Sequence, residues 1–202
     1  MVFVRTPGST RLRRVAAVAA ALLVLTACST TGADEQTRSA GQNGYVGVDR
    51  NVTEIPVEAR KSAPVITGPA LGGGPDLTTD AYDDKVLVVN VWGSWCPPCR
   101  SEAPGLQAAS VQTKDIAQFI GVTSRDNDPA QAEAFVRVNK ITYPSIFDPD
   151  GSVLLRFARD LPPSAIPSTM VIDADGRLAV RILGPISEIT LVDIVEKVAA
   201  GQ

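Results

Sequence analysis

A near-continuous apolar stretch followed shortly by two closely spaced cysteines constrains this chain more than any other feature. Residues 85–92 (KVLVVNVW) are mostly β-branched or aromatic, a pattern typical of a strand buried on both faces of a parallel sheet. Shortly after it come Cys96-Pro97-Pro98-Cys99, and the residues that follow predict a helix ending near residue 113. The two sulfurs are therefore expected where a buried strand ends and a helix begins.

Cysteines at positions i and i+3 of a first helical turn lie on one face, so their sulfur atoms are close enough to form a disulfide. The first sulfur lies at the helix N-terminus, where unpaired N–H groups and the helix dipole favour a thiolate. We therefore expect Cys96 to be the nucleophile that attacks a disulfide, and Cys99 to be the thiol that resolves the mixed disulfide. This reaction needs no cofactor beyond the Cys96–Cys99 dithiol itself.

Other uses of the pair agree less well with the composition. The chain has no His and only one further cysteine, Cys28, so a four-ligand zinc site lacks donors and no metal is expected. The absence of His also excludes Ser-His-Asp and Cys-His catalysis. A purely structural disulfide would close too short a loop to stabilise the fold much. A peroxidatic cysteine would follow a Thr three residues earlier, where this chain has Gly93.

The rest of the pattern predicts an α/β fold with a central mixed sheet flanked by helices on both faces, because strands and helices alternate before a terminal hairpin and helix. Ser187 is the expected N-cap of that last helix. Strands are predicted at residues 52–57, 63–67, 85–92, 116–123, 145–147, 168–172 and 177–183, and helices at 97–113, 129–139 and from 188 onward.

The stretch VNVWGSWCPPCRSEAP at residues 89–104 resembles the active-site segment of the TlpA/ResA-like thiol–disulfide oxidoreductases of the thioredoxin superfamily. The resemblance covers roughly residues 63–198. It implies a thioredoxin-like fold located outside the cytoplasmic membrane, and reduction of disulfides in exported proteins, among them apocytochrome c before haem attachment. It also implies an inserted helix and strand between the active-site helix and a cis-proline, within residues 126–147.

The same resemblance points to three residues around the cysteines. Pro167 precedes a predicted strand, where the superfamily places a cis-proline opposite the first cysteine. A cis Ile166–Pro167 peptide would let the backbone of Ile166 pair with a substrate strand. Trp95 is expected to cover the cysteine pair on one side and so to contact substrate.

A carboxylate near the pair is also implied. Cytoplasmic thioredoxins carry a buried Asp six residues before the first cysteine, whereas this chain has Asn90, which cannot titrate. The resemblance shifts attention to Glu102, one turn beyond Cys99. A buried Glu102 would have a raised pKa and could exchange protons with Cys99. The alternative is a solvated glutamate stabilised by the helix N-terminus.

The N-terminus predicts an export signal. Basic residues precede an apolar run at residues 15–25, which at about 1.5 Å per residue is too short for a bilayer core of about 30 Å. The LTAC that follows resembles a bacterial lipobox, which implies a signal peptide at residues 1–27 and a lipid on Cys28. A plain secretory signal and a short uncleaved anchor are the alternatives. Residues 28–50 predict a flexible polar tether, and residues 51–202 one thioredoxin-like domain.

The net charge of the chain limits the kinds of partner that it is expected to bind. Four of the 19 basic residues and none of the 22 acidic ones precede Cys28, so the chain from Cys28 onward has a formal charge of −7. Binding to phosphates needs a basic surface, so nucleic acid is not an expected partner. The expected partners are exported proteins with disulfides, the bacterial cell membrane through the lipid anchor, and a membrane electron donor that reduces the pair again.

The dipeptide between the cysteines favours a reductant. Pro97 and Pro98 have neither an N–H nor a positive charge, so the Cys96 thiolate should be weakly stabilised and the disulfide comparatively favoured. The main interpretation is a membrane-tethered protein-disulfide reductase that acts in cytochrome c maturation. Two alternatives stay open: an oxidase or isomerase that forms disulfides in exported proteins, and a non-catalytic lipoprotein that uses the fold only for binding.

Overall fold

The computed structural model describes residues 51–202 apart from residue 83, so the predicted signal peptide (1–27), Cys28 and the tether (28–50) lie outside the described residues. Within the described residues, no helix is both long and apolar enough to span a bilayer. The strands are β1 (Val52–Glu54), β2 (Thr67–Gly68), β3 (Leu77–Thr78), β4 (Val86–Trp92), β5 (Ala117–Ser124), β6 (Ser145–Asp148), β7 (Ser168–Ile172) and β8 (Leu178–Leu183). The helices are α2 (Pro97–Gln112), α3 (Pro129–Val138) and α4 (Glu188–Ala199), with short 3-10 helices η2 (Val57–Ala59), η3 (Thr79–Tyr82) and η4 (Leu154–Phe157).

The main sheet is mixed and runs in the order β1-β8-β7-β4-β5-β6. Strands β4, β5 and β6 are parallel, whereas β7 pairs antiparallel with both β4 and β8, and β1 pairs antiparallel with β8. β4 lies near the centre and all seven of its residues are buried, which agrees with its near-continuous apolar sequence. The expected α/β architecture around a central mixed sheet is therefore confirmed.

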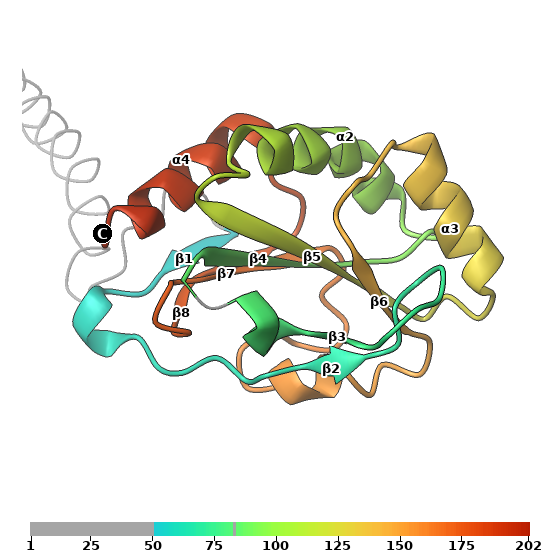
Figure 1. The fold of residues 1–202 in the computed structure, drawn as a ribbon, viewed down its shortest axis with the longest axis horizontal. Coiled ribbons are helices and arrows are strands. Elements are labelled where there is room, and N and C mark those ends of the chain that lie inside the picture. The colour runs from blue at the N-terminus through green and yellow to red at the C-terminus, as the bar shows by residue number, and fades with distance from the viewer. Residues whose placement is uncertain (1–50, 83) are drawn as a thin grey trace, which may run out of the picture. The chain divides into compact units, whose positions relative to one another are not determined.

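Helices α2, α3 and α4 all pack on one face of this sheet (Figure 1). Leu106 of α2, Phe135 of α3 and Leu191 of α4 belong to one core cluster with Val88 and Trp92 of β4. The crossovers β4–α2–β5 and β5–α3–β6 advance in the same direction, and right-handed crossovers of that kind place their helices on the same face. The inserted helix α3 and strand β6 fall where the sequence predicted them. The expected flanking helices are present, but the α-helices do not cover both faces.

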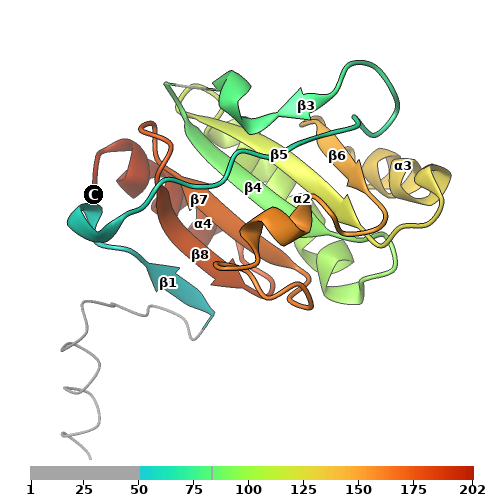
Figure 2. The same cartoon turned by 90° about the horizontal axis from the view of Figure 1, so that it is seen from below.

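The opposite face is covered by irregular chain, the β2–β3 hairpin and the one-turn helix η4 (Figure 2). Ile66, Leu154 and Phe157 are each at most 2% exposed, and they form a second core cluster with Val89 of β4 and Ile120 of β5. The packing on this face of the sheet therefore comes from residues that precede β4 and from the segment that leads to β7.

The two predicted edge segments differ from the observed structure. Only Val52–Glu54 of residues 52–57 forms a strand, since Pro56 has no N–H to extend the ladder. The strand predicted at residues 63–67 is wrong, because this segment is irregular except for Thr67, which begins β2. Pro64 interrupts it in the same way.

The outer side of β6 is paired with the loop that follows β2. The N–H of Phe147 donates to the oxygen of Pro69 at an N–O distance of 2.8 Å. The N–H of Leu71 donates to the oxygen of Ser145, also at 2.8 Å. The backbone of β6 is thus hydrogen-bonded on both sides.

Candidate active site

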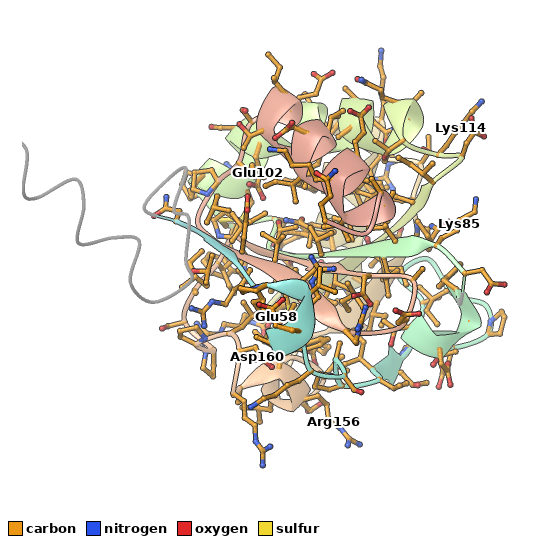
Figure 3. The ribbon with its side chains drawn as sticks, turned by 90° about the vertical axis from the view of Figure 1, so that its left-hand side faces the viewer. Glu58, Lys85, Glu102, Lys114, Arg156 and Asp160 are labelled. Carbon is orange, nitrogen blue, oxygen red and sulfur yellow. A yellow bond between two sulfur atoms is a disulfide. The ribbon has the colours of Figure 1, made fainter. Side chains whose placement is uncertain are left out.

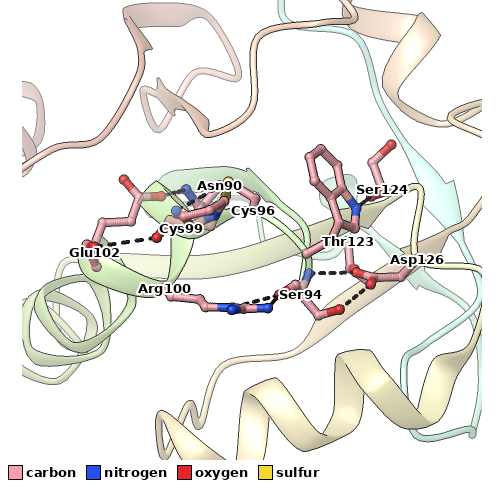
Figure 4. The surroundings of a disulfide bond; sticks show 12 residues. Asn90, Ser94, Cys96, Cys99, Arg100, Glu102, Thr123, Ser124 and Asp126 are labelled. Carbon is pink, nitrogen blue, oxygen red and sulfur yellow. Dashed lines mark hydrogen bonds between the residues drawn. A yellow bond between two sulfur atoms is a disulfide. The ribbon is translucent and has the colours of Figure 1, made fainter.

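Cys96 and Cys99 form a disulfide at the junction of β4 and α2 (Figure 4). Their Cα atoms are 5.3 Å apart. Cys96 is the N-cap residue of α2 and Cys99 lies in the first turn, and both are at most 2% exposed. The predicted position of the pair, at the end of a buried strand and the start of a helix, is confirmed.

Few donors reach the sulfur of Cys96. The N–H of Cys99 donates to it at an N–Sγ distance of 3.3 Å. Pro97 and Pro98 occupy the first helical positions, where other residues would present free N–H groups to the sulfur. The helix dipole and one N–H therefore favour the thiolate, without a donor from either proline.

Glu102 lies one turn beyond Cys99 and is buried, at 5% exposure. Its Oε1 accepts a hydrogen bond from Nδ2 of Asn90 at 3.1 Å, and its Oε2 accepts one from the N–H of Ile186 at 3.2 Å. Nδ2 of Asn90 also donates to Oγ1 of Thr169 in β7, at 3.1 Å. The alternative of a solvated glutamate is therefore wrong.

Burial raises the pKa of Glu102 to about 7, although the hydrogen bonds from Asn90 and Ile186 act to lower it. Figure 3 shows Glu102 inside the outline of the fold, whereas Lys114 and Arg156 project from it. A carboxyl group with such a pKa takes up and releases a proton near neutral pH. That property is what a proton acceptor for Cys99 requires.

The Ile166–Pro167 peptide is cis, as expected. Ser168 pairs with Val91, so Pro167 lies beside the end of β4 from which the cysteine turn emerges. The half-buried Ile166 donates its N–H to the oxygen of Ser164 at 3.1 Å. Pairing of Ile166 with a substrate strand stays a prediction, and in this conformation only its carbonyl would be available.

Trp95 is 45% exposed and its indole leans toward the loop after β5. Its Nε1 donates to the oxygen of Ser124 at 3.2 Å. The indole also occupies the space beside Gly93, where an added Cβ would lie 2.6 Å from Nε1. Contact of Trp95 with substrate stays a prediction.

Sequence reasoning did not single out Asp126, which is buried in the loop after β5 and accepts hydrogen bonds from Ser94 and Thr123 (Figure 4). A signal was available, because Asp126 follows a buried strand directly, and parallel neighbours such as β4 and β5 end at the same edge of the sheet. Among the described residues there is no group of three or more Cys, Asp or Glu side chains that could hold a metal ion.

An enzyme that exchanges disulfides needs two sulfurs that can bridge, with an exchangeable proton beside them. Cys96 and Cys99 supply the bridging sulfurs on a thioredoxin-like scaffold, with Glu102 as the candidate for the proton, and the protein is a thiol–disulfide oxidoreductase of that class. Residues 58–198 match the family model described as Redoxin, and the chain belongs to that family.

The relatives carry names of the same class. The thiol:disulfide interchange protein HelX of Rhodobacter capsulatus is 32% identical over 161 residues, which are 78% of this chain and 88% of HelX. The thiol-disulfide oxidoreductase ResA of Bacillus cereus is 25% identical over 125 residues, 62% of this chain and 70% of ResA. The structure of a secreted thiol-disulfide isomerase from Corynebacterium glutamicum has a TM-score of 0.71 at 27% identity, covering 77% of this chain and 96% of that one. The predicted thioredoxin-like fold and resemblance to ResA-type enzymes are confirmed.

Proposed function

We propose that this oxidoreductase is a protein-disulfide reductase held outside the bacterial cell membrane by a lipid on Cys28. Its proposed substrates are exported proteins with disulfides, including apocytochrome c during cytochrome c maturation. The observation that carries the proposal is the disulfide at the start of α2 with the buried Glu102 one turn behind it. The name HelX and the secreted C. glutamicum relative support the enzymatic class and the location.

The proposed reaction begins with the reduced enzyme. The Cys96 thiolate attacks one sulfur of the substrate disulfide, and the other substrate sulfur leaves as a thiolate that takes a proton from water. Cys99 then passes its proton to Glu102 and attacks the sulfur of Cys96, and the second substrate sulfur leaves as a thiolate that takes a proton from water. The substrate gains two electrons and two protons, and the enzyme is left with the Cys96–Cys99 disulfide. A membrane dithiol donor restores the pair, so no further cofactor is proposed.

The surroundings of Cys96 support the proposed direction of electron flow. Strong oxidants owe their high potential to a stabilised thiolate in the reduced state. Here the N–H of Cys99 is the donor to the sulfur within the described residues, and the two prolines supply none. The reduced form gains little from such an environment, which favours a reductant.

Replacing Cys96 by Ser tests the catalytic assignment. We expect Cys96→Ser to abolish insulin reduction, since no thiolate is left to attack, while Cys99→Ser should accumulate a mixed disulfide that gel electrophoresis resolves. The control is Cys28→Ser in the full-length chain, which removes only the proposed lipid site and should leave turnover unchanged. Normal turnover in Cys96→Ser would refute the assignment.

A disulfide isomerase is the second candidate, because the C. glutamicum structure carries that name. The equilibrium redox potential against dithiothreitol separates the two. A value near that of thioredoxin, about −270 mV, supports a reductase, whereas a value near about −120 mV would favour the formation and rearrangement of disulfides. Detergent partitioning of the wild type and of Cys28→Ser tests the lipid anchor separately.

A further inference from the structure

The loop after β5 holds a buried carboxylate that the proposed reaction does not use. Asp126 is 1% exposed, and none of the ion pairs among residues 51–82 and 84–202 includes it. An ionised carboxylate is costly to bury unless its oxygens accept hydrogen bonds. The donors to Asp126 therefore indicate what the carboxylate does in this fold.

Two of the three donors come from Ser94, two residues before Cys96 (Figure 4). The N–H of Ser94 donates to Oδ2 of Asp126 at 2.9 Å, and the hydroxyl of Ser94 donates to Oδ1. Oγ1 of Thr123 completes the set by donating to Oδ2 at 2.6 Å. Ser94 is thus bound to Asp126 through both its backbone N–H and its hydroxyl.

Ser94 is also held from the side of α2. Nε and Nη2 of Arg100 both donate to the carbonyl oxygen of Ser94, at 2.9 and 2.6 Å. The N–H, hydroxyl and carbonyl of Ser94 are thus all engaged. Only Trp95 separates Ser94 from the nucleophile, and Nε1 of Trp95 donates to the oxygen of Ser124, the last residue of β5.

The loop after β5 reaches the cis-proline side as well. Arg125 has a φ of 60°, in the left-handed region that non-glycine residues seldom adopt. Nη2 of Arg125 donates to the oxygen of Pro163 at 2.9 Å, in the segment that leads to Pro167. One loop therefore contacts both the turn that carries Cys96 and the segment that carries the cis-proline.

We propose that Asp126 is a positioning residue for thiol–disulfide exchange, which holds Ser94 and thereby sets the sulfur of Cys96 at the start of α2 and opposite the Pro167 segment. The reacting atoms do not touch Asp126. Its effect passes through the backbone of the Gly93–Cys96 turn. Misplacement of a nucleophile by about 1 Å can cost about 100-fold in rate, so the effect should be measurable.

Two substitutions separate hydrogen bonding from loss of structure. Asp126→Asn keeps the shape: its Oδ1 can accept from Ser94 N and Thr123, and its Nδ2 can donate to the Ser94 hydroxyl. Asp126→Ala removes all three bonds. We expect Asp126→Ala to lower kcat for insulin reduction by about 10- to 100-fold with little change in KM, and Asp126→Asn to recover most of that loss.

The matched control is Asp148, a second carboxylate with 1% exposure, at the end of β6. The N–H groups of Val153 and Leu154 donate to its side chain, both at 3.0 Å, and no residue of the Gly93–Cys96 turn is among its donors in the described part of the chain. Asp148→Ala should lower the unfolding midpoint as much as Asp126→Ala does and should leave kcat close to that of the wild type.

Three results would overturn the proposal: a wild-type kcat in Asp126→Ala, an Asn variant as slow as the Ala variant, or an equal loss of kcat in Asp148→Ala. If Asp126→Ala does not fold, Ser94→Ala removes one bond and should still lower kcat several-fold. The rate at which dithiothreitol reduces the Cys96–Cys99 disulfide, followed by tryptophan fluorescence, gives the same comparison without a protein substrate. A failure of the proposed reductase function is thereby distinguished from a failure of the proposed role of Asp126.

Discussion

Two carboxylates with nearly equal burial behave in opposite ways in this molecule. Glu102, beside the disulfide, is 5% exposed, and Asp173, in the turn between β7 and β8, is 6% exposed. Burial raises the pKa of Glu102 to about 7, because its donors, Asn90 and the N–H of Ile186, are neutral. Burial acts to raise the pKa of Asp173 too, but hydrogen bonds and charge from Arg177 and hydrogen bonds from Arg60 bring it below its ordinary value.

The difference between the two sites shows that a buried carboxylate can be either a structural group or a candidate proton acceptor. The guanidinium of Arg60 lies 3.3 Å from Asp173 and that of Arg177 lies 3.0 Å from it, so the carboxylate stays ionised and holds the turn. Glu102 has no such partner among the described residues, and its proton is easily exchanged near pH 7. The two arginines beside Asp173, which Glu102 lacks within the described residues, help to separate the structural carboxylate from the candidate proton acceptor.

The largest effect on stability is expected from breaking the ion-paired site. Asp173→Ala would leave the Arg60 guanidinium, whose side chain is 4% exposed, without its carboxylate. We expect the free energy of unfolding to fall by about 3–5 kcal/mol, measured by urea denaturation. Asp175→Ala, which removes an exposed carboxylate from the same turn, is the control and should change stability far less. Equal losses in the two variants would contradict the comparison.

The pH dependence of stability should show the opposite sign at the two sites. Glu102 has a higher pKa in the folded chain than in the unfolded chain, so the folded state binds the extra proton between about pH 4.5 and 7. Its contribution is fully present below about pH 4.5 and is lost as the pH rises to about 7, a change of about 3 kcal/mol. The contribution of Asp173 is present above its ordinary pKa and is lost on acidification.

Glu102→Gln isolates the first of these contributions. Urea denaturation at pH 4.5 and pH 8 should show a smaller decline in stability for this variant than for the wild type. An unchanged decline would mean that Glu102 is not the titrating group. Asp173→Asn should keep the decline that belongs to Glu102, because the two carboxylates lie in separate parts of the fold.

Glu102→Gln should lower turnover by about 100-fold, a somewhat smaller effect. The reason is that the side chain can no longer accept the proton of Cys99. The steady-state rate of insulin reduction measures it, and a mixed disulfide that lasts longer would place the slowed step at Cys99. Asp173→Asn serves as the control and should turn over normally. A slow Asp173→Asn variant would show that the difference between the two sites is not functional.

Much of the architecture could be predicted from the sequence because the buried elements have strong patterns. The predicted strand at 116–123 is observed as β5 (Ala117–Ser124), and Ser187 caps α4 by accepting a hydrogen bond from the N–H of Thr190. Strands β2 and β3 were not predicted as a hairpin, because each has two residues, too few to show periodicity. The location of the α-helices on one face follows from the order of the strands, which no local pattern contains.

The candidate site, too, could be predicted only in part from the sequence. The spacing of the cysteines at a predicted helix start identified Cys96 and Cys99, and the resemblance supplied Glu102, which lies at a fixed distance from them. Asp126 lies outside the motif in a polar loop, and only its place just after a buried strand distinguishes it from a solvated aspartate. Its burial follows from the register of β4 and β5, in which Trp92 is opposite Thr123, and this register brings the two following loops together.

The loop at residues 69–71 has a consequence for how this molecule meets others. An uncovered outer strand of a sheet is a template for pairing with a second chain, which leads to swapped dimers and fibres. Because Pro69 and Leu71 already use the hydrogen-bonding groups of β6, a visiting polypeptide cannot extend the sheet on that side without first displacing them. An unfolded substrate protein is therefore less able to pair with this edge of the sheet. The enzyme can bind extended chains with less risk of becoming part of an aggregate.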